Sequence, residues 1–86
     1  MKGKILSLNK LLPGQKGKVK ELNKKGAMRR RMQDIGLNEN TEVECVGRSP
    51  GGDPAAYLIK SALIALRDED SEAVLVEVWG EADSWV

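Results

Sequence analysis

Residues 27–48 read AMRRRMQDIGLNENTEVECVGR, in which a helical pattern stops at a glycine and gives way to a strand pattern. The apolar side chains of the first part recur at the i, i+4 and i+7 positions of one helical face, and they are Met28, Met32 and Ile35. This spacing predicts an α-helix over 27–35. Gly36 then supplies a left-handed C-terminal cap, which turns Leu37 back onto the last turn of the helix.

Short strands are predicted on both sides of this helix. Residues 41–48 alternate apolar and polar side chains with the period of a half-buried strand, which puts Cys45 on the buried face. Other short apolar runs between turn residues predict strands or arms at 5–12, 17–22, 55–60, 63–67 and 74–79. The acidic stretch 68–73 predicts a short helical turn that Asp68 can cap. The expected fold is therefore mainly β, a small barrel of five or six short strands with one α-helix.

The size of the chain limits what it can hold. With 86 residues, it is expected to form one domain, 1–86, around a modest core. That core must be aliphatic, because the chain has no Phe, one Tyr and two Trp. No run of residues approaches the roughly 20 apolar positions of a membrane span, so no membrane insertion is expected. The cytoplasm is the expected location, since a single cysteine cannot form an internal disulfide.

Few side chains here suit catalysis or metal binding. The chain has no His, so the usual general base and a common metal ligand are both missing. The acids at 68–72 are better explained as a solvated helical turn than as a cation site. Met28 and Met32 are better explained by core packing than by metal ligation. We therefore expect no enzyme activity, no cofactor and no metal site.

Charge is distributed very unevenly along the chain. Residues 1–31 hold eleven Lys and Arg and one acid, whereas residues 32–86 hold three Lys and Arg and twelve acids. Either the two halves attract each other once folded, or the basic half forms a binding face. The basic segment 16–31 makes a nucleic-acid-binding barrel the alternative function. That alternative is disfavoured because the few aromatic residues lie far from this segment in the sequence.

Four motifs in order resemble the ferrous-iron transport protein A (FeoA) family. They are LNKLLPGQKG at 8–17, RMQDIGL at 31–37, SPGGDP at 49–54 and LIALR at 63–67. The resemblance implies an SH3-like barrel in the cytosol, without enzyme activity of its own. It also implies an accessory role in bacterial ferrous-iron uptake, with the GTPase-containing cytosolic region of the inner-membrane transporter as partner. The same barrel occurs in metal-dependent repressors, but since these 86 residues show no helix-turn-helix pattern, we do not expect this chain to act as a repressor by itself.

The residues expected to contact this partner are the basic ones at the helix. We predict that Lys24, Lys25, Arg29 and Arg30 steer association and form rim contacts. Arg29, Arg30 or Arg31 could also act as an arginine finger, but surface charge explains them equally well. A second candidate is the loop 50–54, for which a plain hairpin connection is the simpler explanation. Trp79 and Trp85 suggest a contact surface, and Trp85 could anchor an interface or cover the open edge of the barrel. A homodimer is a further possibility that stays open.

Overall fold

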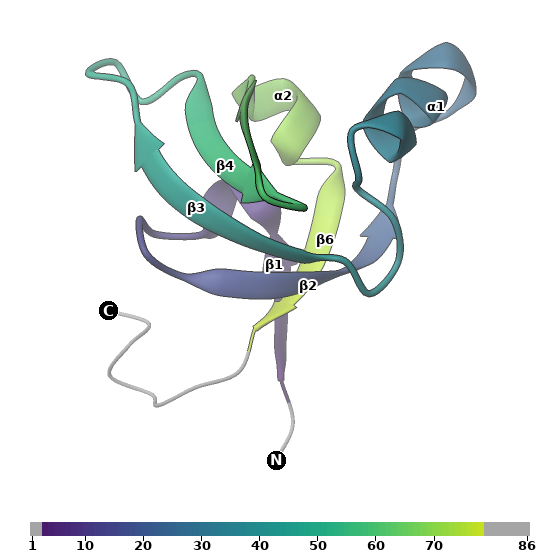
Figure 1. Cartoon of the computed structure of the whole chain (residues 1–86), viewed down its shortest axis with the longest axis horizontal. Helices are drawn as coiled ribbons and strands as arrows, with labels where there is room; N and C mark the ends of the chain where they lie inside the picture. The colour runs from purple at the N-terminus through teal and green to yellow at the C-terminus, as the bar shows by residue number, and fades with distance from the viewer. Residues whose placement is uncertain (1–2, 79–86) are drawn as a thin grey trace.

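Six antiparallel strands form one sheet in the computed structural model, which describes residues 3–78 (Figure 1). The strands are β1 Lys4–Ser7, β2 Lys16–Leu22, β3 Glu42–Arg48, β4 Ala55–Ile59, β5 Ala62–Leu66 and β6 Val74–Val78. Their order in the sheet is β1-β6-β2-β3-β4-β5, so β1 and β5 are its two edges. The helices are α1 Gly26–Asp34 and α2 Asp68–Ser71, with a 3₁₀ turn η1 at Leu8–Lys10. The predicted mainly β fold of five or six short strands is confirmed, with six strands among the described residues.

The sheet curves around an aliphatic core, as its composition requires. Along most strands, every second side chain points inward. Cys45 is fully buried, which confirms the prediction that it faces the core. One large aromatic residue, Tyr57, is buried with it. The remaining fully buried hydrophobic side chains include Leu8, Leu11, Leu37, Ile59, Val74 and Val76. Burial on this scale stabilises the fold by roughly 1.5–3 kcal/mol for each large side chain.

The N-terminal segment, predicted over 5–12 as a strand or arm, is a strand only as far as Ser7, where β1 ends. After β1, η1 turns the chain so that Leu8 and Leu11 both enter the core, while Leu12 stays 40% exposed. Residues three apart lie on one side of a 3₁₀ turn, which explains why these two leucines point the same way. The prediction was therefore correct about the packing of these leucines, but the backbone from Leu8 to Lys10 is a 3₁₀ turn and not a strand.

The helix α1 begins one residue before the predicted start at 27 and ends one residue before 35. The predicted cap is confirmed, because Gly36 has a φ of +113° and the Leu37 N–H donates to the Met32 carbonyl at 3.0 Å. The predicted apolar stripe is only partly a core element. Met32 is the buried residue of α1, whereas Met28 is 37% exposed. The helix thus touches the core over about one turn, and Met28 lies beyond that contact.

The short helix α2 is held by side chains from elsewhere in the chain. Asp68 was predicted to cap it, but the N-cap position belongs to Arg67 and carries no side-chain cap. The Asp68 N–H instead donates to Asp53 Oδ1 at 2.9 Å. The Asp68 carboxylate accepts a hydrogen bond from Asn9 Nδ2 at 3.1 Å. The capping group therefore comes from the β3–β4 loop, because Asp68 is already inside the first turn.

Candidate protein-interaction surface

The four predicted contact residues lie between the end of β2 and the first turns of α1. Three of them, Lys24, Lys25 and Arg29, line one shallow depression of about 410 Å³. Arg30 is exposed on α1 but does not line this depression. The fold thus brings three of the four together, and their role in contacting a partner stays a prediction.

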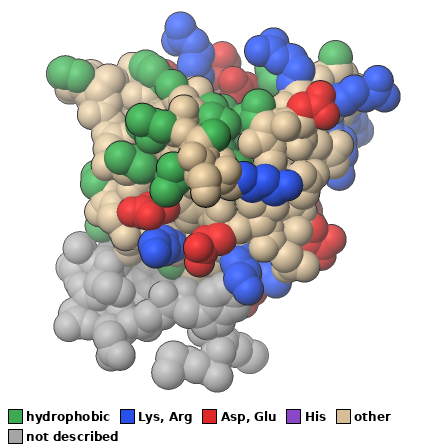
Figure 2. Space-filling model, in the orientation of Figure 1, with side chains coloured by type: hydrophobic (Ala, Val, Ile, Leu, Met, Phe, Trp, Pro, Cys, Tyr) green, Lys and Arg blue, Asp and Glu red, His purple; other side chains and the backbone are tan. Residues whose placement is uncertain are grey.

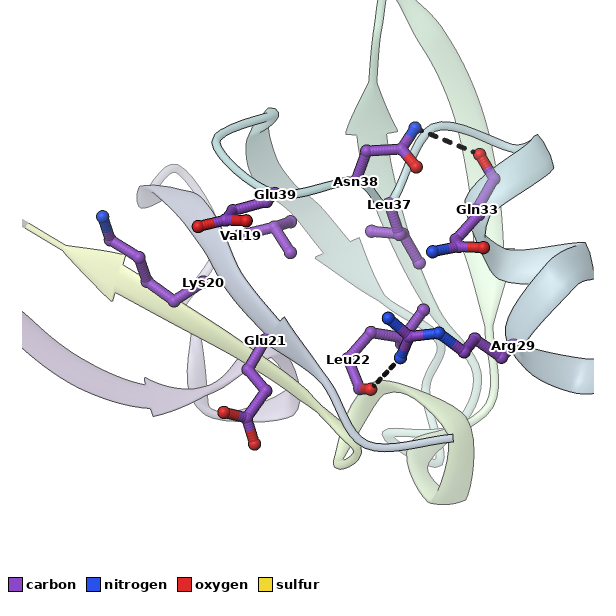
Figure 3. Close-up of a pocket in the computed structure, with 9 residues that line it drawn as sticks. All are labelled: Val19, Lys20, Glu21, Leu22, Arg29, Gln33, Leu37, Asn38 and Glu39. Carbon is purple, nitrogen blue, oxygen red and sulfur yellow. Dashed lines mark hydrogen bonds between the residues drawn. The ribbon is translucent and has the colours of Figure 1, made fainter. Parts of the chain in front are cut away.

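Two of these four side chains already have structural partners. The Arg29 guanidinium donates from Nη1 to the backbone carbonyl of Leu22 at 2.6 Å (Figure 3). The Lys24 ammonium nitrogen lies 3.6 Å from Asp70 Oδ1 on α2. Lys25 and Arg30 form no side-chain hydrogen bond or ion pair with residues 3–78. They are therefore the members of the set whose charge is available to a partner.

A smaller cleft of about 240 Å³ lies between β2 and the segment that follows α1 (Figure 3). Its lining combines Lys20 and Arg29 with Glu21 and Glu39. Lys20 also forms an ion pair with Glu77 at 3.1 Å. Charges of both signs alternate around this cleft, so it does not present a single sign of charge to a polyanion.

Acids from the second half of the chain face much of the basic segment 16–31. Along β2, Lys16 pairs in register with Glu44 of β3, and Lys18 pairs with Glu42. On the other side of β2, Lys18 lies opposite Glu77 of β6. Opposite charges across strands attract each other, so these pairs favour the sheet. Of the two explanations for the uneven charge, mutual attraction of the two halves accounts for the lysines of β2.

The described residues offer little for catalysis or metal ligation. Within residues 3–78, no three His, Cys, Asp or Glu side chains come together as a metal site would require. Burial raises the pKa of the Cys45 thiol, an effect that the neighbouring Arg48 only partly opposes. A buried, protonated thiol is a poor nucleophile. In the same range, no helix has the length and apolar content of a membrane span.

The second predicted contact, the loop 50–54, has a structural role. It joins β3 to β4, and the Gly52 N–H donates to the Ser49 carbonyl at 2.7 Å. Gly52 has a φ of +87°, a conformation that favours glycine. Through Asp53 the loop also holds the start of α2. These contacts agree with a hairpin connection, and its role in partner binding stays a prediction.

An apolar face on β4 and β5 is the feature that the sequence reasoning missed. Leu58 and Leu63 lie opposite each other across the two strands and are 37% and 66% exposed. Ala56 and Ala65 form the neighbouring cross-strand pair on this face. Figure 2 shows hydrophobic side chains gathered on this side of the molecule. A signal was present, since the runs AAYLI and ALIAL have no polar residue at their outward positions.

Ala65 of this face also lines a groove between α1 and β5. The groove has a volume of about 300 Å³. Its apolar lining comprises Met28, Met32, Ile35, Ile64, Ala65 and Leu66. Its charged lining comprises Arg31, Arg67 and Asp70. Contiguous exposed apolar surface rimmed by polar groups is typical of a protein-interaction site. The predicted interface role of Trp79 and Trp85 falls outside the described residues.

Comparison with solved structures confirms the SH3-like fold. A FeoA-like protein from Clostridium acetobutylicum is 32% identical over 94% of this chain and 92% of its own, with a TM-score of 0.81. FeoA from Stenotrophomonas maltophilia, solved with zinc and described as an SH3 domain protein, is 25% identical over 83% and 88%, with a TM-score of 0.74. A manganese-dependent transcriptional repressor shares the fold at 19% identity and a TM-score of 0.78, and this chain spans 37% of its length.

The family follows from the sequence comparison. No curated protein matches the chain. The model of the FeoA domain matches residues 6–78, which include all the described helices and all but the first residues of β1. This range contains all four motifs, at 8–17, 31–37, 49–54 and 63–67. The match covers well over half of the 86 residues, so the chain belongs to the FeoA domain family.

Proposed function

We propose that this chain is a small cytosolic accessory protein of bacterial ferrous-iron uptake. The FeoA domain match over residues 6–78 carries the proposal. Its Stenotrophomonas relative is described as a candidate activating factor of ferrous iron transport. The buried thiol and the lack of a metal cluster within residues 3–78 agree with action through surface contacts.

The proposed partner is the cytosolic, GTPase-containing region of the ferrous-iron transporter. Two surface features support binding to a protein. One is the exposed pair of cations Lys25 and Arg30, which can steer association. The other is the apolar face around Leu58 and Leu63, which can supply affinity through burial.

A nucleic-acid role for the segment 16–31 has less support. Four of its lysines face or pair with acids, namely Lys16, Lys18, Lys20 and Lys24. A phosphate backbone approaching them would also meet those acids. Filter binding at low and high salt tests this alternative, because phosphate contacts make retention fall steeply as salt rises. We expect no retention at either salt concentration.

The experiment is co-purification of the tagged chain with the detergent-solubilised transporter, together with ferrous-iron uptake in cells that lack the chain. We expect the wild type to capture the transporter and to restore uptake. Reversal of both free cations, Lys25→Glu with Arg30→Glu, should weaken capture by about tenfold through lost steering and rim contacts.

The control is Lys10→Glu, which changes the net charge at an exposed position on η1. It should leave capture unchanged. Thermal melting of each variant shows whether the fold is intact. If the wild type captures no transporter and uptake is normal without the chain, the proposed function is wrong.

A further inference from the structure

We propose that β5 and its groove with α1 form a docking site for an extended segment of the partner, in which acidic and apolar residues alternate. The inference rests on the proposed function for the identity of the partner. It goes further by assigning a surface, a binding geometry and a chemistry to the contact. Three independent features of this region support it.

The first feature is a free strand edge. Within residues 3–78, β5 pairs with β4 and with no other strand. Lys60 and Ser61 both have positive φ, as in the tight two-residue turns that join hairpin strands. Such a turn is closed by a hydrogen-bonded pair, here Ile59 with Ala62. The alternation then directs the N–H and C=O groups of Leu63 and Ala65 toward the free edge.

This edge lacks the features that usually block strand addition. The strand β5 reads ALIAL, with no charged residue and no proline. Proteins commonly protect exposed edges with lysine, proline or a bulge. The register between β4 and β5 runs without a bulge from Ala55–Leu66 to Ile59–Ala62. An incoming strand can therefore continue the sheet by main-chain hydrogen bonds, the geometry of β-augmentation.

The second feature is the groove of about 300 Å³ beside this edge. Met28 of α1 and Ile35, which follows its last residue, line it together with Ile64 of β5. In a strand added to β5, every second side chain would point into this groove, because strand side chains alternate between faces. The volume is at the lower end of small-molecule sites, so the groove suits a few apolar side chains better than a cofactor.

The third feature is the charge around the groove. Arg31 of α1 and Arg67 after β5 line it, and both are exposed. Neither guanidinium forms a hydrogen bond or ion pair with residues 3–78. The single acid of the lining, Asp70, is paired with Lys24 at 3.6 Å. The groove thus presents two uncompensated cations, which can bind carboxylates through charge-assisted hydrogen bonds.

This charge favours an acidic partner over a second copy of the chain. Two β5 strands paired with each other would place no carboxylate from ALIAL near Arg31 or Arg67. Main-chain hydrogen bonds and apolar contacts would hold such a dimer, but the two cations would have no carboxylate partner. An extended segment with carboxylates beside its apolar residues can pair with the free edge of β5 and can also neutralise Arg31 and Arg67.

The first part of the test uses a synthetic probe that does not depend on the transporter. A short peptide alternating Glu and Val is titrated into the ¹⁵N-labelled full chain and followed by NMR, with a peptide alternating Lys and Val as the matched control. We expect the acidic peptide to shift the amides of Leu63 and Ala65 and those around the groove. The double variant Arg31→Glu with Arg67→Glu should reverse the preference toward the Lys peptide.

The second part measures capture of the cytosolic region of the transporter. The Arg31→Glu, Arg67→Glu variant should weaken capture about tenfold. Ala65→Pro should also weaken it, because proline removes an outward N–H and obstructs a neighbouring strand. Lys10→Glu is the charge control outside both the groove and the proposed basic contact, and it should leave the peptide titration and the capture unchanged.

The outcomes separate the two proposals. Equal capture by the wild type and the groove variants would overturn the docking site but leave the proposed function standing. Failure of the wild type to capture the transporter, with the peptide preference reversed as expected, would reject the proposed partner and retain the site. If the wild type does not prefer the Glu–Val peptide to the Lys–Val peptide, the docking site is wrong. If the wild type forms a concentration-dependent dimer that Ala65→Pro abolishes, a second copy of the chain is the occupant instead. If Ala65→Pro does not fold, the Arg31→Glu, Arg67→Glu variant still tests the docking site.

Discussion

At Gly36 the backbone takes a φ of +113° directly after α1, and a Cβ atom there would lie 2.9 Å from Ile59 Cγ2. The position therefore excludes other residues twice, through its dihedral angle and through its neighbour. The stability of the fold depends strongly on a few such residues. Tyr57 is another, since it is the one fully buried aromatic side chain among residues 3–78.

Replacing Gly36 should lower the free energy of unfolding. Gly36→Ala must either strain the left-handed backbone or displace Ile59, and we expect a loss of about 1–3 kcal/mol. Urea denaturation measures it. Gly51→Ala is the matched control, because a Cβ atom at Gly51 would meet no atom within 4 Å and its φ is not positive. A Gly36→Ala loss no larger than that of Gly51→Ala would contradict this account.

Alkaline pH should destabilise the fold through Tyr57 and Cys45. Burial raises the pKa of the Tyr57 phenol and of the Cys45 thiol above their usual values. The Tyr57 hydroxyl has no hydrogen-bond partner among residues 3–78, because the Ser71 hydroxyl donates to the Arg67 and Asp68 carbonyls, so burial dominates the rise in the pKa of Tyr57.

Both groups are neutral when protonated, and the unfolded chain releases these protons at lower pH than the folded chain does. The stability they contribute is therefore complete below roughly pH 8.5 and is lost as pH rises through the raised folded pKa values. Urea midpoints between about pH 7 and 11 should fall at the alkaline end. Tyr57→Phe should flatten the part of the fall above roughly pH 10, and an unchanged profile would contradict the role of Tyr57.

At the scale of elements, the two helices are attached to the sheet in different ways. α1 contributes Met32 to the core and is tied to β2 by the hydrogen bond from Arg29 to the Leu22 carbonyl. α2 is held at its first residue by Asp53 and Asn9, which come from separate segments. Light attachment of α1 leaves the groove beside β5 open, because few of its side chains fill the space between them.

Arg29 should stabilise the attachment of α1. Arg29→Ala removes the bond to the Leu22 carbonyl, and we expect a loss of about 1 kcal/mol together with faster amide hydrogen exchange in α1. Arg30→Ala is the matched control, because Arg30 is the next residue of the same helix and has no such bond within residues 3–78. Equal exchange rates in the two variants would show that the Arg29 bond is not what holds the helix.

Asp53 should stabilise the start of α2. Asp53→Ala removes the acceptor of the Asp68 N–H, and we expect a loss of about 0.5–2 kcal/mol, as for other caps. Asp53→Asn retains a side-chain oxygen and should recover much of it. Thermal denaturation of the wild type and the two variants gives their order of stability. If Asp53→Asn is no more stable than Asp53→Ala, capping is not the cause of the loss.

At the scale of the whole molecule, the sheet order mixes the basic and acidic halves of the chain. β2 lies between β3 and β6, so its lysines face glutamates from both neighbours. The Lys20–Glu77 pair at 3.1 Å is part of this arrangement. Among residues 3–78, the acids leave a set of exposed cations unpaired, which includes Lys25, Arg30, Arg31 and Arg67.

Reversing one central acid tests this arrangement. Glu77→Lys would place a third cation beside Lys18 and Lys20, and we expect a loss of about 0.5–1 kcal/mol that shrinks as salt is added. Glu72→Lys is the control, because Glu72 is exposed and its side chain has no partner within residues 3–78. A loss that does not change with salt would mean that packing, not charge, explains the effect.

Most of the fold could be predicted from the sequence, but only part of the candidate site. The cap at Gly36 and the burial of Cys45 follow from spacing within a few residues, where local periodicity reflects burial directly. The structural use of Arg29 could not be predicted, because its acceptor is a backbone carbonyl, and every residue carries one. The exposure of Leu63 was missed since an apolar run looks the same whether one or both faces are covered.

By itself, the sequence determined that this chain is a small β-rich domain with one capped helix, an aliphatic core and the motifs of its family. These properties depend on residue order over short distances. Only the tertiary structure decided that β5 is an edge strand, that α1 lies beside it, and that Arg31 and Arg67 both line the groove between α1 and β5. The physical reason is that a strand edge and a groove are defined by which segments fail to cover a surface, and this depends on the packing of the whole chain.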